Sequence, residues 1–332
     1  MRVPFSSRHL PMLTAGAILV ALLVFGGLRY DHFASLANVF NLLGDYSYVG
    51  IAGVGATFVV LSGGIDLSVG SMIAFTAVLM ADLVARGWHP LSAALVCLVA
   101  CTFMGAAMGW LICFFALPAF MVTLAGMFAI RAACFLVREQ SVGIDHPFFA
   151  WTARHLELDL GGGAVLPMRS LLLLATVAAG VVVARSTGFG RNVYAIGGHE
   201  RSARMMGVPV VATRIRVHAL AGLCSSLAGL VFTMYKQSGD PTSAVGLELS
   251  VIASVVIGGT LLSGGVGSVQ GTLLGVLILG VIRLLIDFQG NVNAAWTSIS
   301  IGLLLLVFIC LQRLIVSIGN RASQQVLPAR KP

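Results

Sequence analysis

The stretch from residue 185 to residue 216, RSTGFGRNVYAIGGHERSARMMGVPVVATRIR, concentrates positive charge more strongly than any other part of the chain. It contains six arginines, and Glu200 is its only acidic residue. Very apolar segments lie on both sides of it. Because lysine and arginine collect in the short cytoplasmic loops of membrane proteins, this stretch predicts the orientation of every span before and after it.

The composition excludes a soluble globular protein. Hydrophobic residues make up 58% of the chain, charged residues only 10%, and the mean hydropathy is +0.99. Soluble domains carry about 25% charged residues. The net charge of +8 is spread over loop ends instead of along one face, so we expect contact with membrane lipid and no nucleic-acid partner. No Gly-Lys pair occurs, which excludes a Walker A phosphate loop, so any ATP must be hydrolysed by another chain.

Ten apolar segments are long enough to be predicted as membrane-spanning helices, each needing roughly 20 residues to cross the hydrocarbon. Glycine, proline or polar residues separate them, and the longest polar stretch, about 138–168, is predicted to fold over the outer face. An even number of spans places both termini on the same side. The predicted spans cover 12–28, 38–61, 67–85, 91–115, 119–137, 169–184, 217–235, 249–262, 269–286 and 295–312.

The positive charges provide a test of this topology. With a cytoplasmic N-terminus, twelve lysines and arginines fall inside and six outside. One span more or fewer would place the N-terminus and the arginine-rich loop on opposite sides. The sequence therefore predicts an all-α polytopic membrane protein of about ten helices. It forms a single transmembrane domain over 1–332, with both termini and a loop at about 185–216 in the cytoplasm.

Two glycine-rich breaks interrupt the apolar runs, SGGIDLSVG at 62–70 and LSGGVGSVQG at 262–271. Asp66 stands where one helix ends and the next begins, so its carboxylate is expected either to cap the new helix or to contact solute. Arg131 lies inside a span and faces either a polar interior or the outer headgroups. The candidate residues for a helix break or a solute path are Gly63, Gly64, Asp66, Arg131, Gly264 and Gly265.

Other function classes have weaker support. The six cysteines fall in apolar runs and the seven histidines are scattered, which indicates no metal site, no cofactor and no catalytic residues. A membrane enzyme is therefore not expected. An ion-coupled secondary transporter of a small polar solute remains the alternative, since its broken helices would form a site at the membrane midplane. The absence of a chain of carboxylates across the spans counts against it.

Four long segments carry a specific family resemblance: TFVVLSGGIDLSVGSMIAF (57–75), LPAFMVTLAGMFAIRAA (117–133), GFGRNVYAIGGHERSARMMGV (188–208) and GLELSVIASVVIGGTLLSGGVGSVQGTLLG (246–275). They resemble the signature blocks of ribose-type permeases of ABC importers, in the same order and over nearly the whole chain. Within that family the chain is most similar to the galactofuranose importer permeases. It departs from the usual pattern at Ala132, His199 and Ser250, where Gly, Asn and Asp are usual.

The resemblance implies the ABC importer permease fold and a multi-pass subunit of the bacterial inner membrane. It implies that this subunit forms the path for a monosaccharide, galactofuranose-like or ribose-like. The implied partners are an ABC ATPase subunit, a periplasmic sugar-binding protein and a second permease subunit, either identical or different. Neither the sugar nor the choice between homodimer and heterodimer follows from the sequence.

The resemblance also implies that a short coupling helix in the arginine-rich loop docks into the ATPase. Its residues are Gly197, Gly198, His199, Glu200, Ala203, Arg204 and Gly207. The glycines at 197, 198 and 207, with Pro209, are fitting boundaries for one helix of about two turns. On that helix we expect Ala203 and Gly207 to share a face that enters a groove of the partner.

Overall fold

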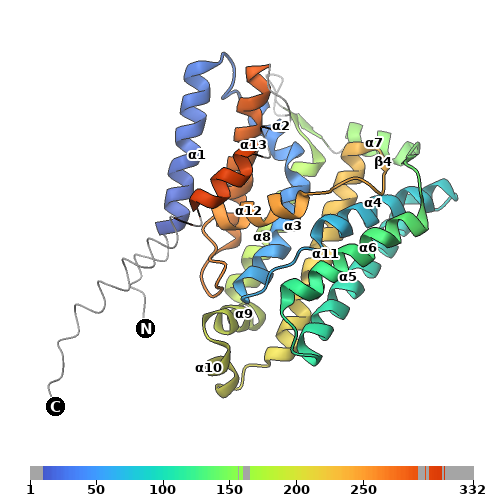
Figure 1. The fold of residues 1–332 in the computed structure, drawn as a ribbon. Coiled ribbons are helices and arrows are strands. Elements are labelled where there is room, and N and C mark those ends of the chain that lie inside the picture. Colours follow the sequence, from blue (N-terminus) through green and yellow to red (C-terminus); the bar gives the residue numbers. More distant parts are fainter. Residues whose placement is uncertain are drawn as a thin grey trace.

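The computed structural model describes residues 10–155, 157–159, 165–290, 296, 299–308 and 310. These residues form a helical bundle with two small antiparallel sheets, β1–β4 and β2–β3 (Figure 1). The helices are α1 Leu10–Arg29, α2 Leu36–Asp45, α3 Ser47–Leu61, α4 Val69–Ala85, α5 Pro90–Phe114, α6 Ala119–Val137, α7 Pro147–His155, α8 Met168–Ser186, α9 Gly188–Gly198, α10 Glu200–Met205, α11 Val210–Lys236, α12 Leu247–Ile257 and α13 Val269–Gln289. The strands are β1 Val142–Gly143, β2 Leu158–Asp159, β3 Val165–Leu166 and β4 Ser238–Gly239.

Each of the ten predicted spans contains a helix among the described residues. Six helices are long and apolar enough to cross a membrane, and α2 with α3, bent by 57°, makes a seventh candidate. The helices α4, α12 and Ile299–Phe308 are shorter. The chain is thus a polytopic helical membrane protein, while the count of ten stays a prediction. Both termini, and with them their orientation, lie outside the described residues.

Helix α3 forms the centre of the bundle. Its sequence, SYVGIAGVGATFVVL, is apolar all round, and 14 of its 15 residues are buried. It packs against α8, α11, α12 and α13. The hydroxyls of Thr57 and Thr272, 2.6 Å apart, join α3 to α13 by a buried hydrogen bond. This bond joins the C-terminal half of α3 to the bundle, and the last residue of the helix, Leu61, leads directly into the first glycine break.

Glycines bring α5 and α11 into the most extensive helix contact. A Cβ added to Gly105 or Gly222 would overlap a carbonyl oxygen of the other helix. Without a hydrophobic driving force between helices in lipid, such close backbone packing is what holds them together. Helix α11 is therefore tightly packed against α5, and α10, which precedes it in the chain, is connected to this packed helix.

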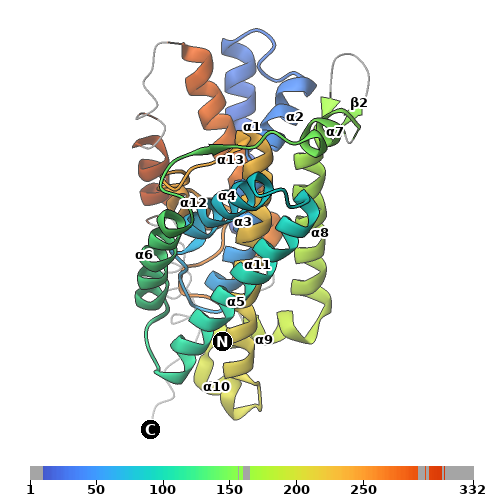
Figure 2. The ribbon, with the colours of Figure 1, turned by 90° about the vertical axis from the view of Figure 1, so that its right-hand side faces the viewer.

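The arginine-rich loop and the 138–168 segment lie at opposite ends of the bundle. Figures 1 and 2 show α9 and α10 at one end and α7, β2 and β4 at the other. The 138–168 segment is held there by the pairing of β1 with β4. Opposite placement is what the predicted topology requires, and which end faces the cytoplasm remains a prediction.

Candidate functional site

Local sequence explains where α10 begins and ends. His199 has an extended backbone, and its Nδ1 accepts a hydrogen bond from the Ser202 N–H at 3.2 Å, which caps the first turn. Gly207 has φ +80°, a conformation that glycine adopts without strain. The Gly207 and Val208 amides then donate to the Arg204 and Ala203 carbonyls, both at 3.1 Å, which is the Schellman arrangement. The expected short helix is present, with a histidine cap.

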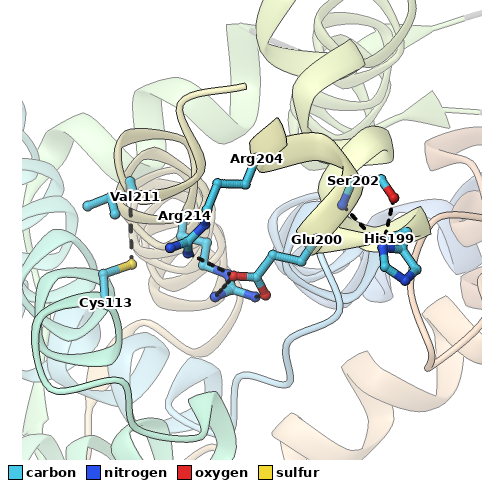
Figure 3. A network of polar contacts seen from close by, with 7 residues as sticks. All are labelled: Cys113, His199, Glu200, Ser202, Arg204, Val211 and Arg214. Atoms are coloured by element: carbon cyan, nitrogen blue, oxygen red, sulfur yellow. Dashed lines mark hydrogen bonds and ion pairs between the residues drawn. The ribbon is translucent and has the colours of Figure 1, made fainter. Parts of the chain in front are cut away.

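An ion-pair network ties α10 to the start of α11 (Figure 3). The Glu200 carboxylate accepts from both terminal nitrogens of Arg214, at 2.7 and 3.3 Å, and from Arg204 at 3.2 Å. The side chains of Glu200 and Arg214 are 38% and 27% exposed. Since partly exposed pairs contribute little stability, their main effect is to fix the direction of α10 relative to α11.

Ala203 does not lie where we expected it. Its side chain is fully buried and packs with Ile196 of α9 and Val210 of α11. The expectation that Ala203 enters a groove of a partner is therefore wrong. The physical reason is that a six-residue helix needs one face against its own chain, and the small Ala203 occupies that face. Gly207 is exposed, beyond the end of the helix.

The outward face of α10 is formed instead by Arg204, which belongs to the predicted coupling residues, and by Arg201, Met205 and Met206, which do not. Met205 and Met206 are 75% and 73% exposed, and Arg201 and Arg204 are exposed beside them. Methionine side chains are flexible and polarizable and are frequent at adaptable binding surfaces. In the sequence, this surface is indicated only by two adjacent methionines in an otherwise polar loop. We call these four residues the α10 face.

A glycine junction connects the end of α9 to both helix breaks. A Cβ on Gly197 would overlap the carbonyl oxygen of Leu61, and Gly264 lies against Gly63 and Gly197. The Gly265 amide donates to the Leu61 carbonyl at 2.9 Å. Three segments that are far apart in the sequence thus meet at backbone distance, which glycines permit because they have no side chain.

Helix α9 also holds the second break directly. The Tyr194 hydroxyl donates to the Gly267 carbonyl at 3.0 Å. At the end of the same break, Gln270 accepts a hydrogen bond from Arg185 of α8 at 2.6 Å. Neither contact was predicted, because the sequence gives no signal that pairs residues 73 or 85 positions apart.

The first break is held by α6 and by hydrogen bonds within the break itself. Asp66 is buried, and its Oδ1 accepts from the Ser68 amide at 2.8 Å and from the Ser68 hydroxyl at 2.6 Å. Thr123 of α6 accepts from the Leu67 amide at 3.2 Å and donates to the Ile65 carbonyl at 3.1 Å. Asp66 thus fixes Ser68, the residue that precedes α4, whereas α4 has no side-chain capping bond at its N-cap residue. The two alternatives for Asp66, capping and solute contact, stay predictions. Its Oδ2 has no hydrogen-bond partner among the described residues.

A cleft of about 290 Å³ lies beside the first break. Gly63, Gly64 and Pro118 line one part of it, and Arg214 and His218 of α11 line another. Arg214 is the same residue that binds Glu200, so the cleft lies next to the attachment point of α10.

Arg131 belongs to a different region. Its Nη1 donates to the carbonyls of Pro241 and Ser243, at 2.8 and 2.6 Å. These residues belong to the connection between α11 and α12. The Arg131 side chain therefore binds polar groups within the protein, which is the first of the two alternatives, and not the outer headgroups. The structure does not bring it to the glycine junction. Of the other five candidate path or break residues, Gly63, Gly264 and Gly265 lie at that junction and Gly64 follows Gly63 in the chain, whereas the contacts of Asp66 are with Ser68.

Comparison with known proteins identifies the family. The family model described as "Branched-chain amino acid transport system / permease component" matches residues 38–309. The inner membrane ABC transporter permease protein YjfF of Escherichia coli is 47% identical over 96% of this chain and 97% of its own length. The fructose import permease protein FruG of Bifidobacterium longum is 33% identical, covering 94% and 93% of the two chains. The ribose import permease protein RbsC of Bacillus subtilis is 32% identical, covering 89% and 90%.

No solved structure matches the chain. The family model covers most of the chain, and the curated relatives match it over nearly their full lengths. The chain therefore belongs to the branched-chain amino acid transport system / permease component family and, within it, resembles the ribose-type carbohydrate permeases of ABC transporters.

Proposed function

We propose that this protein forms the path for a monosaccharide in an ABC importer and that a separate ATPase subunit drives it through α9 and α10. The observation that carries the proposal is the glycine junction, where Gly197 lies against Leu61 and Gly264. One short segment at one end of the bundle thereby contacts both helix breaks. In this proposal that end faces the cytoplasm.

The proposed mechanism follows the contacts. The ATPase binds the α10 face and displaces α10 when it binds or hydrolyses ATP. Glu200 and Arg214 keep α10 attached to α11, so the displacement reaches α9 through the short His199 connection. Helix α9 then moves the second break through Tyr194 and the first through the junction. The cleft beside Gly63 gives the first break room, and the spans on either side change their tilt.

The substrate class rests on the relatives. Two of them are named as fructose and ribose import permeases, which supports a monosaccharide. The galactofuranose-like substrate suggested by the sequence blocks stays part of the proposal. The sugar-binding protein and the second permease subunit are also part of the proposal. The binding protein supplies the selectivity, because the spans offer few polar groups for strong sugar selection.

An ion-coupled transporter is the second candidate, because the Asp66 Oδ2 is buried without a partner among the described residues. A carboxylate oxygen at a helix break is a fitting ligand for a coupling cation. Uptake in proteoliposomes separates the two. The ABC proposal requires ATP and the ATPase subunit, whereas the alternative requires an ion gradient and is abolished by an ionophore.

The decisive experiment changes the α10 face. The double substitution Met205→Asp with Met206→Asp places two charges where the ATPase is proposed to pack. We expect the variant to reach the membrane in normal amounts, to lose the co-purified ATPase subunit, and to lose transport. Arg191→Asp is the matched control, because Arg191 is exposed in α9 and this change alters the net charge by the same amount.

The control separates coupling from lipid anchoring. If the loop only anchors the topology through anionic headgroups, Arg191→Asp should disturb insertion at least as strongly as the methionine pair. If well-inserted Met205→Asp/Met206→Asp protein still binds the ATPase and transports sugar, the coupling role of α10 is rejected.

A further inference from the structure

A polar pocket lies at the end of the bundle opposite α10. Its volume is about 420 Å³, within the roughly 300–1,000 Å³ of small-molecule sites. It is formed where α11 ends, along the connection to α12. The lining residues are Phe232, Lys236, Ser238, Asp240, Thr242, Ser243, Ala244, Val245 and Leu247.

The lining combines groups that fit a neutral polyhydroxyl ligand. Lys236 and Asp240 supply one positive and one negative charge, and three hydroxyls act both as donors and as acceptors. The charges balance, so the pocket has no preference for an anionic or a cationic ligand. Phe232 and Leu247 offer apolar surface for the carbon face of a ring. Lys236 is one of only two lysines in the chain.

The segment that carries these groups is held in a defined shape. Asp240 Oδ1 accepts from the amide and the hydroxyl of Thr242, both at 2.8 Å. Arg131 of α6 clamps the carbonyls of Pro241 and Ser243. Ala244 has φ +60°, a conformation that costs about 1 kcal/mol or more outside glycine. Such strain persists only where surrounding contacts impose it and is frequent at ligand sites.

We propose that this pocket is a sugar-binding site that receives the neutral monosaccharide before it enters the path. The inference rests on the proposed function, which places this end on the outer side. Asp240 and Lys236 bind the sugar hydroxyls, and Arg131 positions the segment without touching the sugar. Asp240 Oδ1 already accepts hydrogen bonds from Thr242, so in this proposal Oδ2 accepts the hydrogen bond from the sugar hydroxyl.

The test is protection of a single cysteine by sugar. In a background with Cys113→Ser and Cys310→Ser, Thr242→Cys places a thiol in the pocket, and Ser141→Cys places one on the exposed outer segment outside it. The assembled transporter is labelled with an impermeant maleimide in the presence of D-ribose, D-fructose, D-galactose or D-galactofuranose. Uptake of the same sugars is measured in parallel. At about ten times the half-protecting concentration, a transported sugar should slow labelling at 242 roughly tenfold. It should not affect labelling at 141.

A second variant probes the chemistry. Asp240→Asn keeps an acceptor for Thr242 but removes the charge. We expect it to raise the half-protecting sugar concentration and the KM for uptake, with kcat unchanged.

The outcomes separate the pocket from the general function. A sugar that is transported but gives no protection at 242 overturns the pocket and leaves the importer intact. Protection by the sugar-binding protein alone, and by no free sugar, also overturns it and identifies a protein-docking surface. If a sugar slows labelling at position 242 but is not taken up, the result supports sugar binding in the pocket and counts against the proposed importer function. The absence of both rejects the two proposals together.

Discussion

The two helix breaks carry similar sequences, SGGIDLSVG and LSGGVGSVQG, but the structure holds them in different ways. Thr123 of α6 and the Asp66 carboxylate fix the first break within its own half of the bundle. Tyr194 of α9 holds the second break. Each break contains a Gly-Gly pair, but the first break is bonded to α6, a predicted span, and the second to α9 in the arginine-rich loop.

This difference indicates a division of roles. A displacement of α9 reaches the second break through a side-chain hydrogen bond. It reaches the first through the packed backbone at Gly197 and through the contact of the Phe189 ring with Phe58 of α3, without a side-chain hydrogen bond among the described residues. We therefore expect substitutions around the second break to affect coupling more than stability. Substitutions that loosen the first break should do the reverse.

The largest effect is expected at the junction that both breaks share. Gly197→Ala should reduce transport and sugar-stimulated ATP hydrolysis together by more than about tenfold, because overpacking by one methyl group costs about 1–3 kcal/mol. Gly198→Ala should behave nearly as the wild type, because a Cβ there meets no atom within 4 Å. Both activities are measured in proteoliposomes with equal amounts of assembled complex. Equal losses in the two variants would remove the junction from the mechanism.

Thr123→Val breaks the restraint on the first break at nearly constant volume. It leaves the Leu67 amide and the Ile65 carbonyl without this partner, at an expected cost of about 1–3 kcal/mol. The thermal unfolding midpoint in detergent should fall. Thr102→Val is the control, because Thr102 donates only to the carbonyl four residues earlier in its own helix. If both variants unfold at the same temperature, Thr123 does not hold the break.

Tyr194→Phe removes the hydroxyl that joins α9 to the second break. One hydrogen bond contributes about 0.5–1.5 kcal/mol, so the midpoint should change little. Transport per complex should nevertheless fall by a few-fold. The loss of transport divided by the loss of stability should therefore be larger for Tyr194→Phe than for Thr123→Val. The ratio is obtained by measuring uptake and unfolding on the same preparations. An equal or smaller ratio would contradict the division of roles.

Glu200→Gln should have the smallest effect. It weakens partly exposed ion pairs with Arg204 and Arg214, worth at most about 1 kcal/mol. The difference in stability from the wild type should shrink as salt rises from low concentration to about 1 M. Glu139→Gln is the comparison, since Glu139 is exposed and no ion pair involves it among the described residues. A large, salt-independent loss would show that Glu200 does more than orient α10.

The features that depend on local composition could be predicted from the amino-acid sequence. Apolar length and the bias of arginine predicted the helical segments and the opposite placement of the 138–168 and 185–216 regions. The boundaries of α10 also followed, because a cap at His199 and a left-handed turn at Gly207 depend on neighbours within a few residues.

Which of these features meet depends on how the helices pack in three dimensions. The glycines at 63, 197 and 264 were identified as separate breaks and boundaries, and nothing local indicates that their backbones touch. The burial of Ala203 and the attachment of Arg131 to Pro241 likewise depend on how distant helices pack. The physical reason is that helix formation is driven by nearby residues, whereas the direction of a side chain and the closeness of two backbones depend on the surface opposite them.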